Sequence, residues 1–246
     1  RCYLIDLPGY GQSQAKDPDG ASGVYSKSNM AKEIAAVASS LGLDSFRLLG
    51  HDRGARVAYR LAQIAPEMVT KLGLIEIIPS LDFWENIDAV QAHRAYHWTF
   101  LAQPSPRPET LINSNPRYYA SWALETWCSS QAPIKTTKAA FDSYQSQFFE
   151  PDRVRAFCED YRAGFAEDLA DDGAMLDEGV KILAPTLILH TPKLTRTSRR
   201  TAKDIWSRWA QDVRAIEVES GHYIQEERPE ETLRAFVPFF QPTAKG

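Results

Sequence analysis

Residues 50–54 read Gly-His-Asp-Arg-Gly, an aspartate between two glycines. An apolar run precedes the segment and a helical pattern follows it, which predicts a sharp turn between a strand and a helix. This is typical of a nucleophile elbow, where small neighbours permit a strained turn and the central side chain stands above the sheet edge. A carboxylate there, Asp52, is suited to attack carbon and form an ester intermediate. The alternative is an ordinary turn with an aspartate that caps the helix.

An ester of Asp52 requires a base that activates water for its hydrolysis. His222 follows the last predicted strand in the sequence Ser-Gly-His, and it satisfies the chain order nucleophile, acid, histidine of this kind of site. The other histidines are placed less suitably, within the turn, at a strand end or in the central part of the chain: His51, His190, His93 and His97. The alternative for His222 is a histidine of a surface loop.

Glu76 is the candidate for the acid that orients His222. It lies in an apolar strand end, where a carboxylate is costly to bury without a partner. Residues 190–193, after the next-to-last predicted strand, offer no carboxylate. Pairing with His222 would explain the burial of Glu76, and an ion pair with a neighbouring arginine is the alternative.

Two arginines follow the predicted nucleophile. Arg53 and Arg56 are three residues apart, so they share one face of the predicted helix. Two guanidinium groups are suited to hold a substrate carboxylate bidentately. The alternative is that one of them neutralises Asp52 or pairs with a surface acid.

The elements that position these residues follow from the apolar pattern. Five short, near-continuous apolar runs predict strands that are covered on both faces, at 2–7, 46–50, 72–78, 186–190 and 213–218. Helical patterns lie between them, and a last helix is predicted over 229–240. This alternation indicates an α/β fold with a mostly parallel sheet. Residues 81–170 lack a buried-strand pattern, so we expect a helical cap there and a core formed by 1–80 and 171–246.

Composition narrows the class of protein. The chain has 246 residues, 43% hydrophobic and 24% charged, with a net charge of −4 and no Lys/Arg cluster, which argues against nucleic-acid binding. The apolar runs are far shorter than the roughly 18 residues of a membrane helix. Three widely spaced cysteines favour a reducing, cytoplasmic compartment. Because Arg1 opens directly into an apolar run, we expect an N-terminally incomplete sequence whose core lacks its first strands.

The motifs together resemble the fluoroacetate (haloacetate) dehalogenases, a family of the α/β-hydrolase superfamily, over nearly the whole chain. Residues 50–56, Gly-His-Asp-Arg-Gly-Ala-Arg, look like the elbow of that family, and residues 6–11 resemble its Asp-x-x-Gly-Tyr-Gly loop. Residues 96–104, 158–163 and 220–222 are similar to its cap and histidine motifs. One position departs from the pattern, since Glu76 stands where the family usually has aspartate.

The resemblance implies an α/β-hydrolase fold with an inserted helical cap and hydrolysis of short 2-haloacids such as haloacetates, without metal or organic cofactor. Asp52 would displace halide from carbon, and His222 would activate water against the ester. The residues matched to the other roles are Arg53 and Arg56 for the substrate carboxylate, His97, Trp98 and Tyr161 for the leaving halide, and Trp127 for the pocket wall. A homodimer is also implied.

Two other functions remain open at this point. Epoxide hydrolysis uses the same aspartate–histidine chemistry with cap tyrosines that polarise the ring oxygen, and this chain has several: Tyr96, Tyr118, Tyr119, Tyr144 and Tyr161. The arginine pair argues against a neutral epoxide. A catalytically impaired hydrolase-fold protein that binds a ligand or partner is the second alternative, suggested by the abrupt start and by Glu76.

Overall fold

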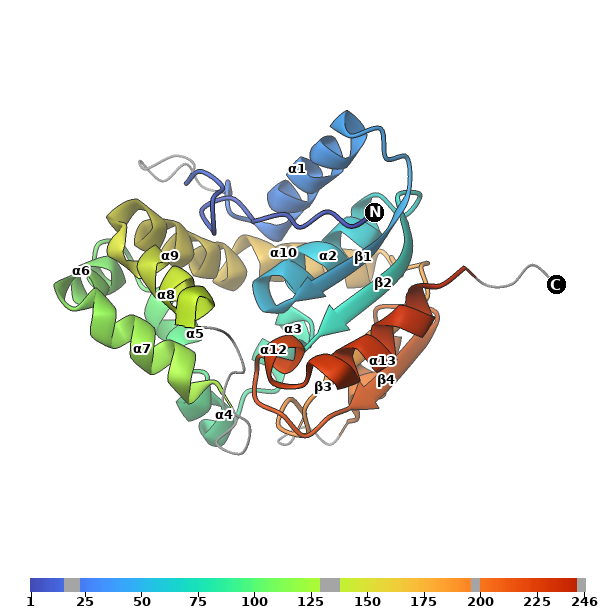
Figure 1. The fold of residues 1–246 in the computed structure, drawn as a ribbon. Coiled ribbons are helices and arrows are strands. Elements are labelled where there is room, and N and C mark those ends of the chain that lie inside the picture. Colours follow the sequence, from blue (N-terminus) through green and yellow to red (C-terminus); the bar gives the residue numbers. More distant parts are fainter. Residues whose placement is uncertain (16–22, 129–137, 196–199, 243–246) are drawn as a thin grey trace.

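A parallel sheet lies at the centre of the computed structural model, whose described residues are 1–15, 23–128, 138–195 and 200–242 (Figure 1). In these residues the sheet has four strands, paired in the order of the chain. They are β1 (Phe46–His51), β2 (Val69–Ile75), β3 (Thr186–His190) and β4 (Val213–Glu217). The predicted α/β fold with a parallel sheet is therefore confirmed.

The register aligns the carboxyl ends of these strands. His51 pairs with Ile75, Ile75 with Leu189, and the next residue of β3, His190, pairs with Glu217. Residues that follow β1, β2 and β3 therefore emerge at the same edge of the sheet. This edge is where ligands bind in open α/β sheets.

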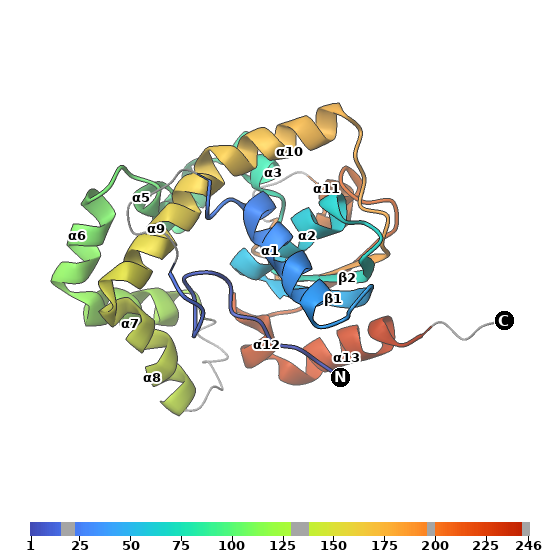
Figure 2. The same ribbon diagram turned by 90° about the horizontal axis from the view of Figure 1, so that it is seen from above.

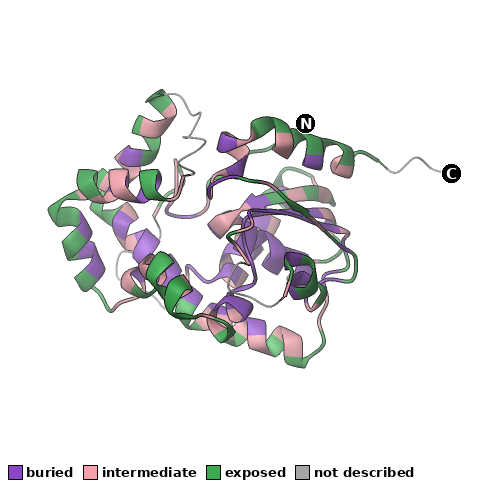
Figure 3. Cartoon of the chain, turned by 90° about the horizontal axis from the view of Figure 1, so that it is seen from below, coloured by how far each residue is buried: buried purple, intermediate pink, exposed green. Residues whose placement is uncertain are grey.

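Helices cover both faces of the sheet. On one face lie α1 (Lys27–Ser40), α2 (Asp52–Ile64) and α11 (Ala202–Ser207), and on the other α12 (Ile224–Glu227) and α13 (Pro229–Phe240). Figure 3 shows the buried residues concentrated on the strands and on the helix faces turned toward them. All five residues of β3 are buried, which explains its near-continuous apolar sequence.

The chain between β2 and β3 forms helices and, in its described residues, no strand, as expected. The elements are α3 (Ser80–Glu85), α4 (Ala89–Arg94), α5 (Tyr96–Leu101), α6 (Arg107–Ser114), α7 (Pro116–Thr126), α8 (Lys138–Ser146), the short η1 (Gln147–Phe149), α9 (Pro151–Phe165) and α10 (Glu167–Asp177). We call α4–α9 the cap; Figures 1 and 2 show it beside the sheet, joined to the core by α10. The division into domains at 81–170 remains a prediction.

The cap has an apolar centre of its own. Leu101 of α5, Ile112 of α6, and Val154, Cys158 and Tyr161 of α9 form one buried cluster. None of the helices in the described part of the chain is both long and apolar enough to cross a membrane.

The predicted strand over residues 2–7 is wrong. This segment is extended but pairs with no strand of the described sheet, and Leu4 is 94% exposed. An apolar run forms a strand only where a neighbouring strand supplies hydrogen-bond partners. The strand predicted at 72–78 also ends earlier, at Ile75, because Glu76 adopts a left-handed backbone with φ of 52°.

Candidate active site

The elbow forms where β1 passes into α2. Asp52 has a left-handed backbone with φ of 45°, a conformation that costs a non-glycine residue about 1–3 kcal/mol. Gly50 is required there, because a Cβ on it would lie 2.6 Å from the Cα of Ala55. A Cβ on Gly54 would lie in open space, so only the first glycine of the pattern is fixed by a close approach. The strained turn exposes part of the Asp52 side chain at the carboxyl edge of the sheet.

His222 faces Asp52, as predicted from its position after the last strand. The His222 Nε2 lies 3.5 Å from the Asp52 Oδ2, and each side chain is about a quarter exposed (25% and 27%). A histidine and a carboxylate at this separation can act in turn on the same reacting group.

The loop that carries His222 is held from several sides. The buried carboxylate of Glu227 accepts hydrogen bonds from the amides of Gly221 and Tyr223, at 2.9 and 3.2 Å. The His222 amide donates to the carbonyl of Trp127 in the cap at 2.8 Å, and its carbonyl lies 2.9 Å from Nε2 of His51. The imidazole of His222 is therefore fixed relative to both the core and the cap.

Asp52 and His222 shift each other's pKa. Burial favours the neutral form of Asp52, but the hydrogen bond and charge of His222 outweigh it and hold the pKa of Asp52 far below its usual range. Burial likewise lowers the pKa of His222, but the Asp52 carboxylate and the charge of Glu76 raise it above its ordinary value of 6.5. Asp52 is thus a carboxylate over the whole working pH range, as a nucleophile requires.

Glu76 lies at the predicted edge, but its direct partner differs from the one predicted. Its carboxylate accepts hydrogen bonds from the amide and the hydroxyl of Thr191, at 2.6 and 2.7 Å. Among the described residues the Glu76 carboxylate accepts hydrogen bonds from Thr191 alone, and its effect on His222 is electrostatic. Burial raises the pKa of Glu76, against the opposing influence of His222 and Thr191. No sequence pattern distinguishes Thr191, apart from its place directly after β3.

The two arginines of α2 predicted to bind a substrate carboxylate contact different neighbours. The guanidinium of Arg53 is paired with Asp160 of α9, and Arg53 is not among the described lining residues of the cavity described below, so its contact with a substrate carboxylate stays a prediction. Arg56 donates to the carbonyl of Ile78 and to the hydroxyl of Ser80, at 3.2 and 2.9 Å. Its Cζ lies 4.4 Å from the ring centre of Trp98.

A cavity of about 730 Å³ opens between the sheet edge and the cap. The predicted site residues that line it are Asp52, Arg56, Glu76, His97, Trp98, Trp127 and His222. Arg53 and Tyr161 are not among its described lining residues; Tyr161 lies behind His97, with ring centres 5.8 Å apart. The cavity is therefore lined by the predicted nucleophile, the predicted base, one of the two arginines, and the aromatic residues His97, Trp98 and Trp127.

The aromatic residues that line the cavity pack against one another and include the polar side chains of His97 and Trp98. Trp98 stacks on Phe83 with ring centres 4.0 Å apart, and His97 lies 4.6 Å from the ring centre of Trp127. Burial lowers the pKa of His97 to about 4, so the ring is neutral at pH 7. Its Nδ1 is buried and has no hydrogen-bond partner among the described residues. A buried polar atom of this kind is suited to a ligand's hydrogen bond.

Among the described residues, no group of three or more His, Cys, Asp or Glu side chains is arranged to hold a metal ion. The residues around the site that sequence reasoning missed are Asp160, Thr191, Glu227 and the supporting role of His51. Asp160, Thr191 and His51 contact partners more than 100 residues away, for which the sequence pattern contains no signal, whereas Glu227 contacts the nearby loop of His222.

Comparison with known proteins identifies relatives that match nearly the whole chain. The α/β-hydrolase fold family matches residues 1–229. A fluoroacetate dehalogenase of Burkholderia sp. is 30% identical over 98% of this chain and 78% of the relative. A soluble epoxide hydrolase of Corynebacterium sp. (strain C12) is 25% identical over 96% and 79%.

Solved structures are similar as well. A Pseudomonas aeruginosa protein provisionally described as an epoxide hydrolase, solved as a mutant with bound MFA, superposes with a TM-score of 0.88. It is 35% identical and covers 95% of this chain and 77% of its own. Cfl2 of Burkholderia cenocepacia superposes with a TM-score of 0.81 at 29% identity, over 96% and 77% of the two chains.

Proposed function

The chain belongs to the α/β-hydrolase fold family, and we propose that within this family it is a hydrolytic dehalogenase of short 2-haloacids such as haloacetates. The observation that carries the proposal is the carboxylate at the elbow, Asp52, with His222 at 3.5 Å and Arg56 in the same cavity. An aspartate nucleophile forms an alkyl ester, and an arginine in the cavity favours a substrate with a carboxylate. The similarity to a fluoroacetate dehalogenase supports the same assignment.

In the first step an oxygen of Asp52 attacks the carbon that bears the halogen. The new C–O bond forms as the carbon–halogen bond breaks, and the halide leaves with the bonding electron pair. Arg56 holds the substrate carboxylate, with Arg53 as the second predicted arginine. We assign the developing halide charge to the polar hydrogens of His97, Trp98 and Tyr161, since preorganised donors lower the barrier where charge develops.

In the second step His222 takes a proton from water, and the resulting hydroxide adds to the carbonyl carbon of the Asp52 ester. Collapse of the adduct releases the 2-hydroxyacid and restores the carboxylate of Asp52. Esterification removes the negative charge that raised the pKa of His222, so burial lowers this pKa against the remaining charge of Glu76. Formation of the ester therefore converts His222 into the neutral base that the second step needs.

A change at Glu76 is expected to alter the pH dependence in a defined direction. His222 acts as a base only when neutral, so turnover falls as the pH decreases through its pKa. Glu76 raises that pKa, and the Glu76→Gln variant should therefore move the acidic limb of kcat to lower pH, by about one unit. The measurement is kcat between about pH 5 and pH 9.

Glu219 provides the matched control for this prediction, because it is an exposed acid three residues before His222. In the Glu219→Gln variant the acidic limb of the kcat profile should lie at the same pH as in the unmodified protein. An acidic limb that moves to higher pH, or stays in place, in an active Glu76→Gln variant would contradict the electrostatic role of Glu76.

Halide release tests the proposed function directly. The protein should release fluoride from fluoroacetate and chloride from chloroacetate. Replacing Trp98 by phenylalanine should lower fluoride release by about 100-fold, because one preorganised donor to the leaving group is lost. Chloride, a better leaving group, should be affected less.

The Trp84→Phe variant is the control, since Trp84 packs against Trp98 but is not among the described lining residues of the cavity. It should preserve the ratio of fluoride to chloride release. If the unmodified protein releases neither halide, the proposed function fails; if it releases chloride alone, the assignment of the fluoride donors fails.

Epoxide hydrolysis is the second candidate, favoured by the volume of the cavity. About 730 Å³ is in the range of sites for drug-sized ligands and exceeds what haloacetate fills. Of the cap tyrosines named above, however, only Tyr96 is among the described lining residues. Diol formation from a styrene-oxide-type substrate, without halide release from haloacetates, would favour this alternative.

A further inference from the structure

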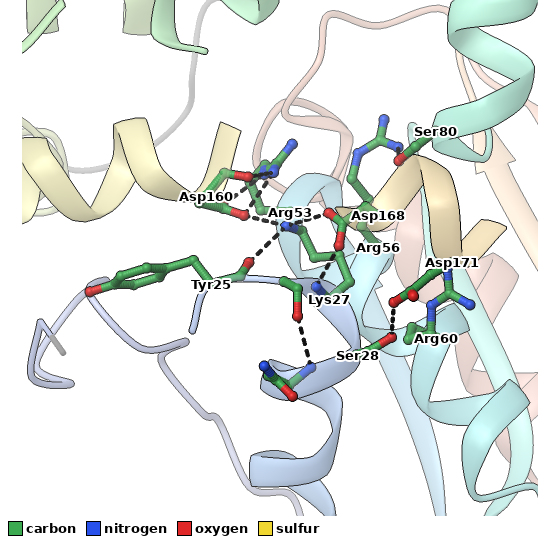
Figure 4. Close-up of polar contacts among 12 residues, drawn as sticks. Tyr25, Lys27, Ser28, Arg53, Arg56, Arg60, Ser80, Asp160, Asp168 and Asp171 are labelled. Atoms are coloured by element: carbon green, nitrogen blue, oxygen red, sulfur yellow. Dashed lines mark hydrogen bonds and ion pairs between the residues drawn. The ribbon is translucent and has the colours of Figure 1, made fainter. Parts of the chain in front are cut away.

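A buried group of charges lies directly behind the elbow, where the core meets α9 and α10 (Figure 4). It contains two cations, Lys27 and Arg53, and two anions, Asp160 and Asp168, with side chains at most 8% exposed. Lys27 forms ion pairs with both carboxylates, the one to Asp168 at 3.0 Å. Charges buried this deeply persist because each has a partner of opposite sign.

Asp160 holds the guanidinium of Arg53 from two directions. Arg53 Nε donates to Oδ2 at 2.8 Å and Nη2 donates to Oδ1 at 2.7 Å, and Nη2 also donates to the carbonyl of Asp160 at 2.8 Å. The hydroxyl of Tyr10 donates to the same Oδ2 at 2.5 Å. The Arg53 Cζ lies 4.3 Å from the ring centre of Tyr161. The orientation of Arg53 is thus set by α9, far from it in sequence.

The neighbour of Arg53 in the chain is the nucleophile. A guanidinium without its carboxylate partner would be a buried, unpaired charge, and the carboxylate of Asp52 is the adjacent acceptor that could neutralise it. An arginine bound to Asp52 would withdraw the electron pair that attacks the substrate and would displace His222. A free nucleophile at the elbow therefore requires that another acceptor bind the guanidinium of Arg53.

We propose that Asp160 is a positioning residue that holds the Arg53 guanidinium off Asp52, so that the nucleophile stays free for the substrate and for His222. It acts through Arg53 and touches no reacting atom. The inference rests on the proposed function for its kinetic assay, and a second measurement below requires no substrate.

A second buried pair on the same helix supplies a matched control. Arg60 of α2 donates to Asp172 of α10 at 2.6 Å, and both side chains are fully buried. Asp172 also accepts from Tyr59 and from the amide of Leu81. Asp160 joins α2 to α9 of the cap, and Asp172 joins α2 to the next helix along the chain, α10. Arg60 lies eight residues after Asp52, about 12 Å along the helix axis, too far to bind the nucleophile.

The experiment compares Asp160→Asn with Asp172→Asn, which remove one buried negative charge each. Halide release gives kcat, thermal unfolding gives Tm, and an NMR titration of the His222 ring gives its pKa. Asp160→Asn should lower kcat by about 100-fold, as expected when a reacting group is displaced. It should also lower the pKa of His222 by about one unit, because the freed guanidinium neutralises Asp52. Asp172→Asn should lower Tm and leave the other two quantities near those of the unmodified protein.

Replacing both Asp160 and Arg53 distinguishes a positioning role of Asp160 from a purely stabilising one. In Asp160→Asn/Arg53→Met the guanidinium that Asp160 released is gone, Arg56 keeps its own partners, and Lys27 still balances Asp168. The pKa of His222 should return to that of the unmodified protein. If Asp160→Asn does not fold, a folded double variant with that pKa supports the proposal, and a double variant that also fails to fold contradicts it.

The proposal is overturned if Asp160→Asn loses stability as Asp172→Asn does but keeps kcat and the pKa of His222. The proposed function is tested by a separate outcome. If the unmodified protein releases no halide, that function fails, whereas the NMR comparison still decides whether Asp160 controls Arg53.

Discussion

Replacing Asp52 by asparagine is expected to lower halide release by about 10⁴-fold or more, with the fold intact. The amide oxygen cannot attack carbon as a carboxylate does, so no ester forms. Asparagine tolerates the left-handed backbone, with φ of 45° at this position, better than most residues. Released halide and thermal unfolding are the two measurements. Asp44, an exposed aspartate ahead of β1, is the control, and Asp44→Asn should retain full activity.

The strain at the elbow gives this prediction a second, independent part. Asp52→Ala and Asp52→Gly both lack a nucleophile and should both be inactive. The glycine variant should be the more stable by about 1 kcal/mol, because alanine is strained in the left-handed region. Undiminished turnover in any Asp52 variant would exclude the carboxylate mechanism, and equal stability of the alanine and glycine variants would show that the turn is not strained.

Replacing His222 by glutamine is expected to stop the reaction halfway. Asp52 remains a carboxylate and can still displace halide, but the ester lacks the base that activates water. One equivalent of halide per protein molecule should be released in a burst, after which turnover ceases. Intact-protein mass spectrometry after incubation with chloroacetate should show a carboxymethyl adduct, and peptide analysis should place it on Asp52.

The double variant Asp52→Asn/His222→Gln provides the control and should give neither burst nor adduct. A His222→Gln variant that turns over at an undiminished rate would assign the base to another residue. An adduct on a residue other than Asp52 would reassign the nucleophile. The two experiments therefore separate the roles of the aspartate and the histidine.

Features that depend on neighbours in sequence could be predicted from sequence. The elbow at Asp52 was recognisable because strand, glycine, carboxylate and helix follow one another within a few residues. The strand over 186–190 and the helix over 229–240 agree with the structure to the residue. His222 was predicted because it follows the last strand and satisfies the chain order nucleophile, acid, histidine, and its Nε2 lies 3.5 Å from the Asp52 Oδ2.

Features that depend on distant partners could not be predicted. Arg53 is separated from Asp160 by 107 residues, and Glu76 from Thr191 by 115. The sequence indicated that these charges needed partners, but several acids and arginines could have supplied them. The predicted strand over 2–7 failed for the same reason, because its apolar pattern does not reveal whether a neighbouring strand is present.

The sequence by itself determined the fold class and the candidates for the nucleophile and the base, since periodicity and turn chemistry act over a few residues and the order of parallel strands fixes the common edge. Only the tertiary structure decided that Arg53 belongs to Asp160, that Glu76 is bound by Thr191, and that Arg56, His97 and Trp98 share one cavity with Asp52. The pairing of Glu76 with Thr191 depends on the pairing of β2 with β3, and the other contacts depend on how the cap packs against the core. A buried charge selects its partner by position in space, and that position is set by the packing of helices from separate parts of the chain.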